Sequence, residues 1–278
     1  MSALVSSLPE GGAVSALPAS AASATPPAGE AVANGSAIAL YARPSAGYAA
    51  KLERTLALLR AAAAEHAGRI VQATSLGVED MVITDLIACH ALPIAIATLE
   101  TGKLHRETAA LIGRTEQRYG LAVAVYRPRE EQVVHFVREN GEEAMYRSLA
   151  LRKACCRLRK LEPLSRMLAD RTAWVTGLRR EQSDARGEVP FRDRDDAGRL
   201  KLNALADWTW GDVWHHVDIH EVPYNPLHDH FMPSIGCAPC TRAIAVGEPF
   251  RAGRWWWEDE AAKECGLHVH QEAGATAR

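Results

Sequence analysis

Five of the six cysteines in this 278-residue chain have spacings that suggest chemistry. Cys155 and Cys156 are adjacent, Cys237 and Cys240 form a Cys-x-x-Cys pair, and Cys265 lies near the end. Neighbouring Cα atoms are only about 3.8 Å apart, below the usual disulfide range of about 4.4–6.8 Å. The adjacent cysteines are therefore poorly placed to bridge each other. Two doublets that meet in a fold predict a four-sulfur metal site.

Zinc and an iron–sulfur cluster are the two candidates for this site. Zinc ribbons normally use two Cys-x-x-Cys pairs, and two adjacent ligands fit poorly around one small tetrahedral ion. A cubane cluster offers separate iron corners, so the pattern favours one [4Fe-4S] cluster per subunit over zinc. Two unrelated thiol pairs remain the alternative. The sixth cysteine, Cys89, lies in an apolar predicted helix and is expected to belong to the core.

Basic residues surround the adjacent cysteines and would offset the negative charge of a thiolate cluster. Lys160 lies one helical turn after Cys156, so it is the best candidate to lie between the cluster and an anionic ligand. A solvated helix face is the alternative. Planar guanidinium groups suit phosphate and sulfate, which predicts a substrate with at least two negative charges. The arginines beside glycine and aromatic residues in predicted loops are Arg179, Arg180, Arg242, Arg251 and Arg254.

The remaining cysteine of the pattern, Cys265, is a candidate nucleophile. A cysteine attacks as the thiolate, which a cationic environment stabilises. The arginines described above could supply that environment, and His268 could add to it. The alternative is a spare thiol in a terminal tail.

Two polar turns follow predicted strands and could hold an anion. Residues 75–80 (SLGVED) contain Ser75 and Gly77 and lead into a helix, whose N-terminus attracts phosphate. Residues 99–105 (LETGKLH) contain Thr101 and follow the next strand. Ligands of open parallel sheets bind outside the carboxyl ends of the strands, so both turns could border one pocket. An ordinary strand-to-helix turn and an ordinary helix cap are the respective alternatives.

Alternating strands and helices indicate an α/β fold, with a doubly wound, mostly parallel sheet, helices on both faces and a loop-rich C-terminal segment. Strands are expected at residues 69–74, 92–98, 121–126, 172–176 and 200–205. Helices are expected at 51–66, 81–90, 103–119 with a stop at Gly120, 130–139, 142–149 and onward through the cysteine pair to 169, and 209–220 with Asp207 as cap.

Composition bounds the class of protein. Hydrophobic residues make up 47% of the chain, and the net charge of −2 argues against a general nucleic-acid binder. We expect a cytoplasmic protein without membrane contact, since neither a long apolar run nor a signal peptide is evident. Residues 1–46 are rich in Ala, Ser, Gly and Pro and are expected to be disordered, a transit peptide being the alternative. We assign 47–250 to the α/β domain and 251–278 to a mobile C-terminal segment.

The motifs closely resemble those of assimilatory adenylyl-sulfate reductases, the iron–sulfur branch of the thioredoxin-dependent phosphosulfate reductases. The resemblance covers roughly residues 51–268 and rests on SLGVED, LETGKLH, KACCRLRKLEPL, GLRREQS, ADWT, VPYNPLHD, SIGCAPCTR, RAGRWWWE and KECGLH. It implies the adenine nucleotide alpha hydrolase-like fold of the ATP pyrophosphatases. It also implies a role in sulfate assimilation and cysteine biosynthesis, in which adenosine 5′-phosphosulfate is reduced to sulfite and AMP.

The resemblance also implies roles for individual residues. Cys265 would be the catalytic nucleophile, carrying an S-sulfocysteine that thioredoxin or a glutaredoxin-like dithiol resolves. A [4Fe-4S] cluster would be bound by Cys155, Cys156, Cys237 and Cys240. The substrate-binding candidates are Ser75, Gly77, Thr101, Lys160, Gly177, Arg179, Arg180, Arg251, Arg254 and His268.

This chain departs from the family pattern in its second motif. The family usually has LDTGRLH, whereas Glu100 and Lys103 stand here in place of Asp and Arg. Both keep the charge, so we expect altered detail rather than lost binding. Three questions stay open: whether the 3′-phosphorylated nucleotide is used instead or as well, whether the chain is a non-catalytic zinc-bearing nucleotide-binding regulator, and whether it forms a homo-oligomer.

Overall fold

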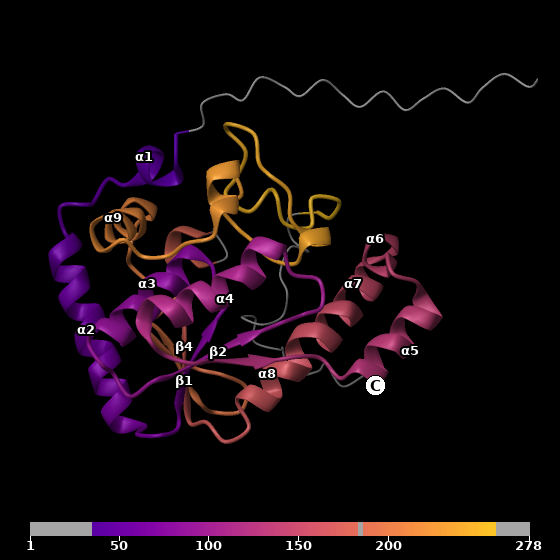
Figure 1. Cartoon of the computed structure of the whole chain (residues 1–278), viewed down its shortest axis with the longest axis horizontal. Helices are drawn as coiled ribbons and strands as arrows, with labels where there is room; N and C mark the ends of the chain where they lie inside the picture. Colours follow the sequence, from indigo (N-terminus) through magenta and orange to yellow (C-terminus); the bar gives the residue numbers. More distant parts are fainter. Residues whose placement is uncertain (1–34, 183–185, 260–278) are drawn as a thin grey trace, which may run out of the picture. The chain divides into compact units, whose positions relative to one another are not determined.

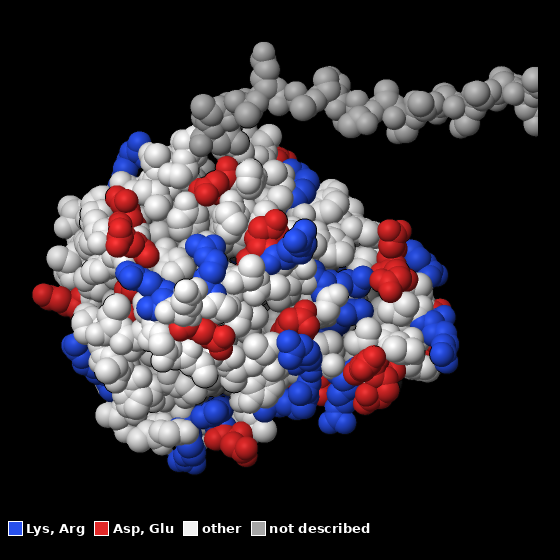
Figure 2. Space-filling view, in the orientation of Figure 1, with Lys and Arg blue, Asp and Glu red and all other residues white. Residues whose placement is uncertain are grey.

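A computed structural model describes residues 35–182 and 186–259 of the chain. Cys265, His268 and most of the 1–46 segment lie outside these residues, so the predictions on them stay predictions. In the described part, no helix is both long and apolar enough to cross a membrane. Figure 2 shows Lys and Arg side chains interspersed with Asp and Glu over the visible face.

A six-stranded sheet organises the described region, with the strand order β3-β2-β1-β4-β6-β5. Three of its strands, β1, β2 and β4, are labelled in Figure 1. All neighbouring strands are parallel except β5 and β6, which pair antiparallel. The chain adds β2 and β3 on one side of β1 and then β4 and β6 on the other, so the order reverses at β1. This confirms the predicted doubly wound, mostly parallel sheet. The strands are β1 (Ile70–Thr74), β2 (Ala95–Leu99), β3 (Val123–Tyr126), β4 (Ala173–Thr176), β5 (Arg192–Arg194) and β6 (Leu200–Asn203).

Two hydrophobic cores lie on opposite faces of the sheet, because successive strand side chains point in opposite directions. Ile70 belongs to the larger core, with residues of α2, α3, α4 and α9, whereas Val71 belongs to a smaller one with Met167 of α8. The helices are α2 (Tyr48–Glu65), α3 (Val78–Cys89), α4 (Arg106–Tyr119), α5 (Glu130–Asn140), α6 (Ala144–Arg147), α7 (Leu149–Cys156), α8 (Glu162–Met167) and α9 (Trp210–His220).

Helix ends follow local hydrogen-bonding chemistry. Gly120 ends α4 in the left-handed conformation at φ 63°, as the sequence predicts. The prediction of Asp207 as the cap of α9 is wrong. Thr209 caps α9 instead, because its side chain accepts from the Asp212 backbone N–H while the Asp212 carboxylate accepts from Thr209 in return.

The helix that carries the adjacent cysteines is interrupted by a π-helical segment. It begins at Leu149, and the side chain of Ser148 caps it by accepting from the Leu151 N–H. After α7 the chain widens into a π-helix over Arg157–Leu161 and returns to α-helical geometry in α8. The predicted passage of the helix through the cysteine pair is therefore confirmed. The π segment carries Lys160, and such segments are common at functional sites.

One α-helix and one strand are missing from the predictions. Helix α1 (Ala37–Tyr41) lies in the 1–46 segment that we expected to be disordered; Ala37 is fully buried, and the Tyr41 ring lies 6.5 Å from that of Trp214 on α9. Strand β5 was missed because its sequence, RDR, has no apolar alternation. At the other end, Ala252–Trp255 are buried, so this part of the 251–278 segment belongs to the folded region.

Candidate active site

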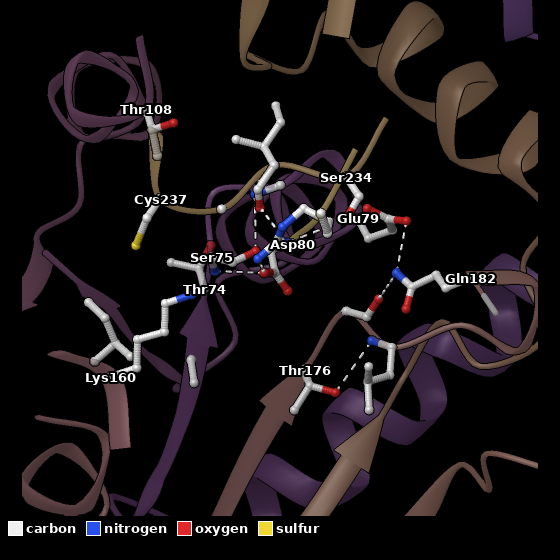
Figure 3. Close-up of a pocket in the computed structure, with 18 of the residues that line it drawn as sticks. Thr74, Ser75, Glu79, Asp80, Thr108, Lys160, Thr176, Gln182, Ser234 and Cys237 are labelled. Atoms are coloured by element: carbon white, nitrogen blue, oxygen red, sulfur yellow. Dashed lines mark hydrogen bonds between the residues drawn. The ribbon is translucent and has the colours of Figure 1, made fainter. Parts of the chain in front are cut away.

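A deep pocket in the described region lies where the strand order reverses. Turns after β1, β2 and β4 border it, through Ser75, Thr101 and Gly177. The carboxyl ends of parallel strands are the usual place for a ligand in such sheets. Figure 3 shows Lys160 and Cys237 on one side of this pocket and Gln182 on the other. The two predicted polar turns thus border one cavity, as the sequence implies.

The turn after β1 is held in shape by its own hydrogen bonds. The Ser75 backbone N–H and hydroxyl both donate to Asp80 Oδ2, each at 2.6 Å. Leu76 adopts a left-handed conformation at φ 60°, which is unusual for a bulky residue, and its N–H donates to Thr74 Oγ1 at 3.0 Å. These contacts direct the N-terminus of α3 toward the pocket.

Gly177 allows the turn after β4 to lie directly against this helix. A Cβ atom at this position would lie 2.6 Å from Asp80 Oδ1 and 3.1 Å from the Asp80 backbone nitrogen. Real Cβ atoms do not approach so closely, so a larger residue would push β4 and α3 apart. The glycine therefore shapes the pocket by its size rather than by its conformation.

Arg179 and Arg180 do not line the pocket, which departs from the predicted substrate contact. Arg179 is buried and donates to Glu79 Oε1 from Nε at 3.1 Å and from Nη2 at 3.0 Å. Gln182 Nε2 donates to the same oxygen at 3.0 Å (Figure 3). Arg180 Nε donates to the Val189 carbonyl at 2.9 Å. The protein itself supplies hydrogen-bond acceptors for both guanidinium groups. Arg179 can therefore affect the pocket through Glu79, which lines it.

Burial makes the Asp80 carboxyl group a weaker acid than usual. Removal from water raises its pKa from 3.8 to about 6, against the opposing effect of the Ser75 hydrogen bonds. The negative charge of Glu79 adds to the rise. Asp80 therefore changes its charge between pH 5 and 7, at the wall of the pocket.

The pKa of Asp80 predicts a pH-dependent stability difference. Between pH 3.8 and about 6, the folded state keeps a proton on Asp80 that the unfolded chain has released. The resulting contribution to the free energy of unfolding is complete below pH 3.8 and is lost as the pH rises through about 6. Asp80→Asn removes the titration. Its free energy of unfolding, relative to the wild type, should therefore rise by about 2 kcal/mol between pH 4.5 and 7. Urea unfolding at both pH values measures this, and a pH-independent difference would contradict it.

The four predicted cluster cysteines lie together. Cys155, Cys156, Cys237 and Cys240 are 7–8% exposed and lie in one buried cluster with Met145 and Trp255. The Cys-x-x-Cys loop is held against the β2 turn, since the Ala238 N–H donates to the Lys103 carbonyl at 2.8 Å. Thr101 Oγ1 lies 3.3 Å from Cys237 Sγ. The cysteine cluster and the pocket therefore share a wall.

Burial raises the pKa of two of these thiols, and nearby cations act in the opposite direction. Burial raises the pKa of Cys240 to about 11, while Lys160 and Arg254 act to lower it. Burial also raises the pKa of Cys155, and Arg159 opposes this. Arg159 is itself oriented by the Thr101 carbonyl, to which Nη1 donates at 2.7 Å.

The donor set fits an iron–sulfur cluster. Four thiols from two segments meet in a dry environment with cations beside them, and a bound metal is what would keep such thiols deprotonated. Within residues 35–182 and 186–259, no group of three or more His, Cys, Asp or Glu side chains is arranged to hold a single metal ion.

The other predicted residues divide by location. Lys160, Arg251 and Arg254 line the pocket, as do Ser75, Gly77, Thr101 and Gly177. Arg242 lies at the surface, where it forms a two-point ion pair with Glu248. Cys89 was expected in the core, but it is exposed at the end of α3. The departures from the family motif also have local partners: Glu100 accepts from the Gly102 N–H, and Lys103 pairs with Glu142.

Several pocket residues were missed by the sequence reasoning. Asp80 and Gln182 lie within the motifs SLGVED and GLRREQS, and His228 lies within VPYNPLHD. Arg186 follows three positions after GLRREQS and also lines the pocket. The motifs were therefore the available signal, but spacing alone does not tell which of their residues face the cavity.

Comparisons with known proteins agree with this geometry. The phosphoadenosine phosphosulfate reductase domain matches residues 69–243. An adenosine 5′-phosphosulfate reductase of Allochromatium vinosum is 56% identical over 73% of this chain and 80% of its own length. A Burkholderia cepacia protein of the same name is 51% identical over 75% of this chain and 84% of its own length.

Among solved structures, the phosphoadenylyl-sulfate reductase of Candida auris, in a phosphate complex, has a similar fold. Its TM-score is 0.58 at 23% identity, and the match covers 71% of this chain and 94% of that one. The family predicted from the sequence motifs is confirmed. The chain belongs to the phosphoadenosine phosphosulfate reductase family.

Proposed function

We propose that this protein is an adenosine 5′-phosphosulfate reductase, which converts its substrate to sulfite and AMP. The observation that carries the proposal is a single pocket with two kinds of border. Turns at the carboxyl ends of parallel strands, where nucleotides commonly bind, form one border. A buried cluster of four cysteines, with Lys160 and Arg254 beside it, forms the other. The names of the relatives at about 50% identity support the same substrate.

The substrate would lie with its nucleoside along the turns after β1 and β4 and its phosphosulfate toward Lys160, Arg251 and Arg254. These cations would offset the charge of the anion. Cys155, Cys156, Cys237 and Cys240 would hold a [4Fe-4S] cluster, which when bound supplies a localised charge beside the sulfate group. No electron transfer through the cluster is required, because the reductant is a dithiol.

The reaction would proceed by two thiolate attacks. The Cys265 thiolate attacks the sulfur of the sulfate group, and the S–O bond to AMP breaks with its electron pair leaving on AMP. A thiolate of thioredoxin, or of a glutaredoxin-like dithiol, then attacks the Cys265 sulfur and releases sulfite. The second thiol of the reductant resolves the mixed disulfide, so the dithiol is oxidised and Cys265 is restored.

Cys265 lies six residues after Asp259, the last described residue. An extended chain of that length spans at most about 20–22 Å. Asp259 follows Trp255, which lines the pocket, so the C-terminal segment has the length to bring the thiol to the substrate. Such a reductase would act with its dithiol partner in the cytoplasm.

The proposal is tested by anaerobic assay of sulfite release from adenosine 5′-phosphosulfate with reduced thioredoxin. We expect turnover, with a higher kcat/KM than for the 3′-phosphorylated nucleotide. A preference for the 3′-phosphate would assign the chain to the other branch of the family. A colourless, zinc-containing protein without turnover on either nucleotide would overturn the proposal in favour of a regulator.

Lys160→Gln should lower kcat/KM for adenosine 5′-phosphosulfate at least about ten-fold, because it removes a cation beside the phosphosulfate. Iron content should stay unchanged. Lys153→Gln is the matched control, since Lys153 is exposed on the same helix. Steady-state kinetics of the two variants measures the effect, and equal kcat/KM values would contradict the assigned position of Lys160.

A further inference from the structure

A buried ion pair ties the end of the described chain to the cysteine helix. Arg152 on α7 donates to Glu258 from Nε to Oε1 at 3.0 Å and from Nη2 to Oε2 at 2.6 Å. The side chains are only 1% and 7% exposed. Two parallel charge-assisted hydrogen bonds fix both side chains, and breaking such a pair in a dry site is costly. Glu258 thus has a defined place relative to the helix that carries Cys155 and Cys156.

A second set of contacts attaches the same turn to the other cysteine doublet. The Arg152 guanidinium lies 4.6 Å from the centre of the Trp255 ring. The Trp255 N–H donates to the Cys240 carbonyl at 3.3 Å, and the Glu258 N–H donates to the Trp255 carbonyl at 2.8 Å. Trp255 is held at φ 42°, a left-handed conformation that a bulky residue keeps only when its surroundings impose it. The turn from Trp255 to Glu258 is therefore anchored to both doublets.

The anchor lies at the start of the segment that carries Cys265. Cys265 is the seventh residue after Glu258, so the thiol can reach at most about 23–25 Å from this point. Fixing one end of a short tether raises the effective concentration of the group at the other end. If the start of the tether were released, Cys265 would sample a larger volume, and productive encounters with bound substrate would become rarer.

We infer that Arg152 and Glu258 form a positioning pair for the Cys265 nucleophile. The pair sets the origin of the C-terminal segment against the helix of the adjacent cysteines, and so ties the presentation of the thiol to the cysteine cluster. The inference rests on the proposed function, in which Cys265 is sulfonated. Neither residue of the pair touches the reacting atoms.

The test uses Glu258→Gln in the iron-loaded, full-length enzyme. Gln keeps the shape of the side chain but removes the charge that Arg152 binds. In a single turnover without thioredoxin, we expect Cys265 to be sulfonated at least about ten-fold more slowly, a loss of about 1.4 kcal/mol in transition-state stabilisation. The Kd for AMP and the iron content should equal those of the wild type. Glu258→Asp, which retains the charge, should recover part of the rate.

Glu248→Gln is the matched control. It breaks another two-point Arg–Glu pair of the C-terminal region, Arg242–Glu248, whose side chains are 37% and 32% exposed. This variant should sulfonate Cys265 at the wild-type rate. Wild-type sulfonation by Glu258→Gln would overturn the inference, as would loss of iron or of AMP binding in that variant, since the pair would then be only structural. Turnover by Cys265→Ser would instead overturn the proposed function.

Discussion

Cys265→Ser should abolish sulfite release while leaving substrate binding and the iron content intact. A serine hydroxyl remains protonated at neutral pH and cannot attack sulfur as a thiolate does, so the first chemical step is lost. We expect kcat to fall by at least about 10³-fold, or about 4 kcal/mol. Anaerobic sulfite assays measure the rate, and equilibrium binding of AMP measures the integrity of the pocket.

The control for this variant is Cys89→Ser. Cys89 is exposed at the C-terminal end of α3, whereas the pocket is bordered by the N-terminal end of the same helix. It should retain wild-type turnover. A Cys265→Ser enzyme with normal kcat would show that another thiol, or water, attacks the substrate.

Cys240→Ser should remove the iron–sulfur cluster. Serine is a much weaker iron ligand than a thiolate, and the described residues of this buried cluster include no fifth cysteine to take its place. We expect the iron content to fall from about four per chain in the wild type to near zero, with loss of the absorbance of the cluster. Iron analysis and the visible spectrum of the anaerobically purified variant measure this.

The same preparation distinguishes a cluster from zinc. Stoichiometric zinc in the wild-type protein, with no brown colour, would contradict the cluster assignment. Full iron retention in Cys240→Ser would show that this residue is not a ligand.

A variant that loses the cluster should also be less stable than the wild type. Arg152 and Arg159 lie beside the cysteines, and without the cluster these cations would lose the negative charge that they offset.

The sequence predicted the fold well where hydrophobic periodicity is strong. The helix at residues 106–119 was recognisable because its apolar residues recur at helical spacing and Gly120 ends it. Strand β5 escaped recognition because three charged or polar residues at a sheet edge have no such pattern. Helix α1 escaped because its stability comes from packing on α9 rather than from its own composition.

For the site, residue types and spacing identified the cysteines and the polar turns, but not which side chains face the ligand. Arginine is a residue type that often binds anions, yet the guanidinium group of Arg179 forms an ion pair with Glu79 in the folded chain. Asp80 was not singled out within its motif, yet it lines the pocket with a raised pKa. Such assignments depend on which acceptor lies nearest in space, and a linear sequence does not contain that distance.

The most direct test of the proposed reaction is to identify the atom that receives the sulfonate group. The iron-loaded enzyme is mixed with adenosine 5′-phosphosulfate in the absence of any dithiol, digested, and its peptides are analysed by mass spectrometry. We predict one sulfonate on Cys265, AMP released in equal amount, and loss of the sulfonate as sulfite when reduced thioredoxin is added. An enzyme that forms sulfite with thioredoxin but never carries sulfonate on Cys265 would contradict the proposal.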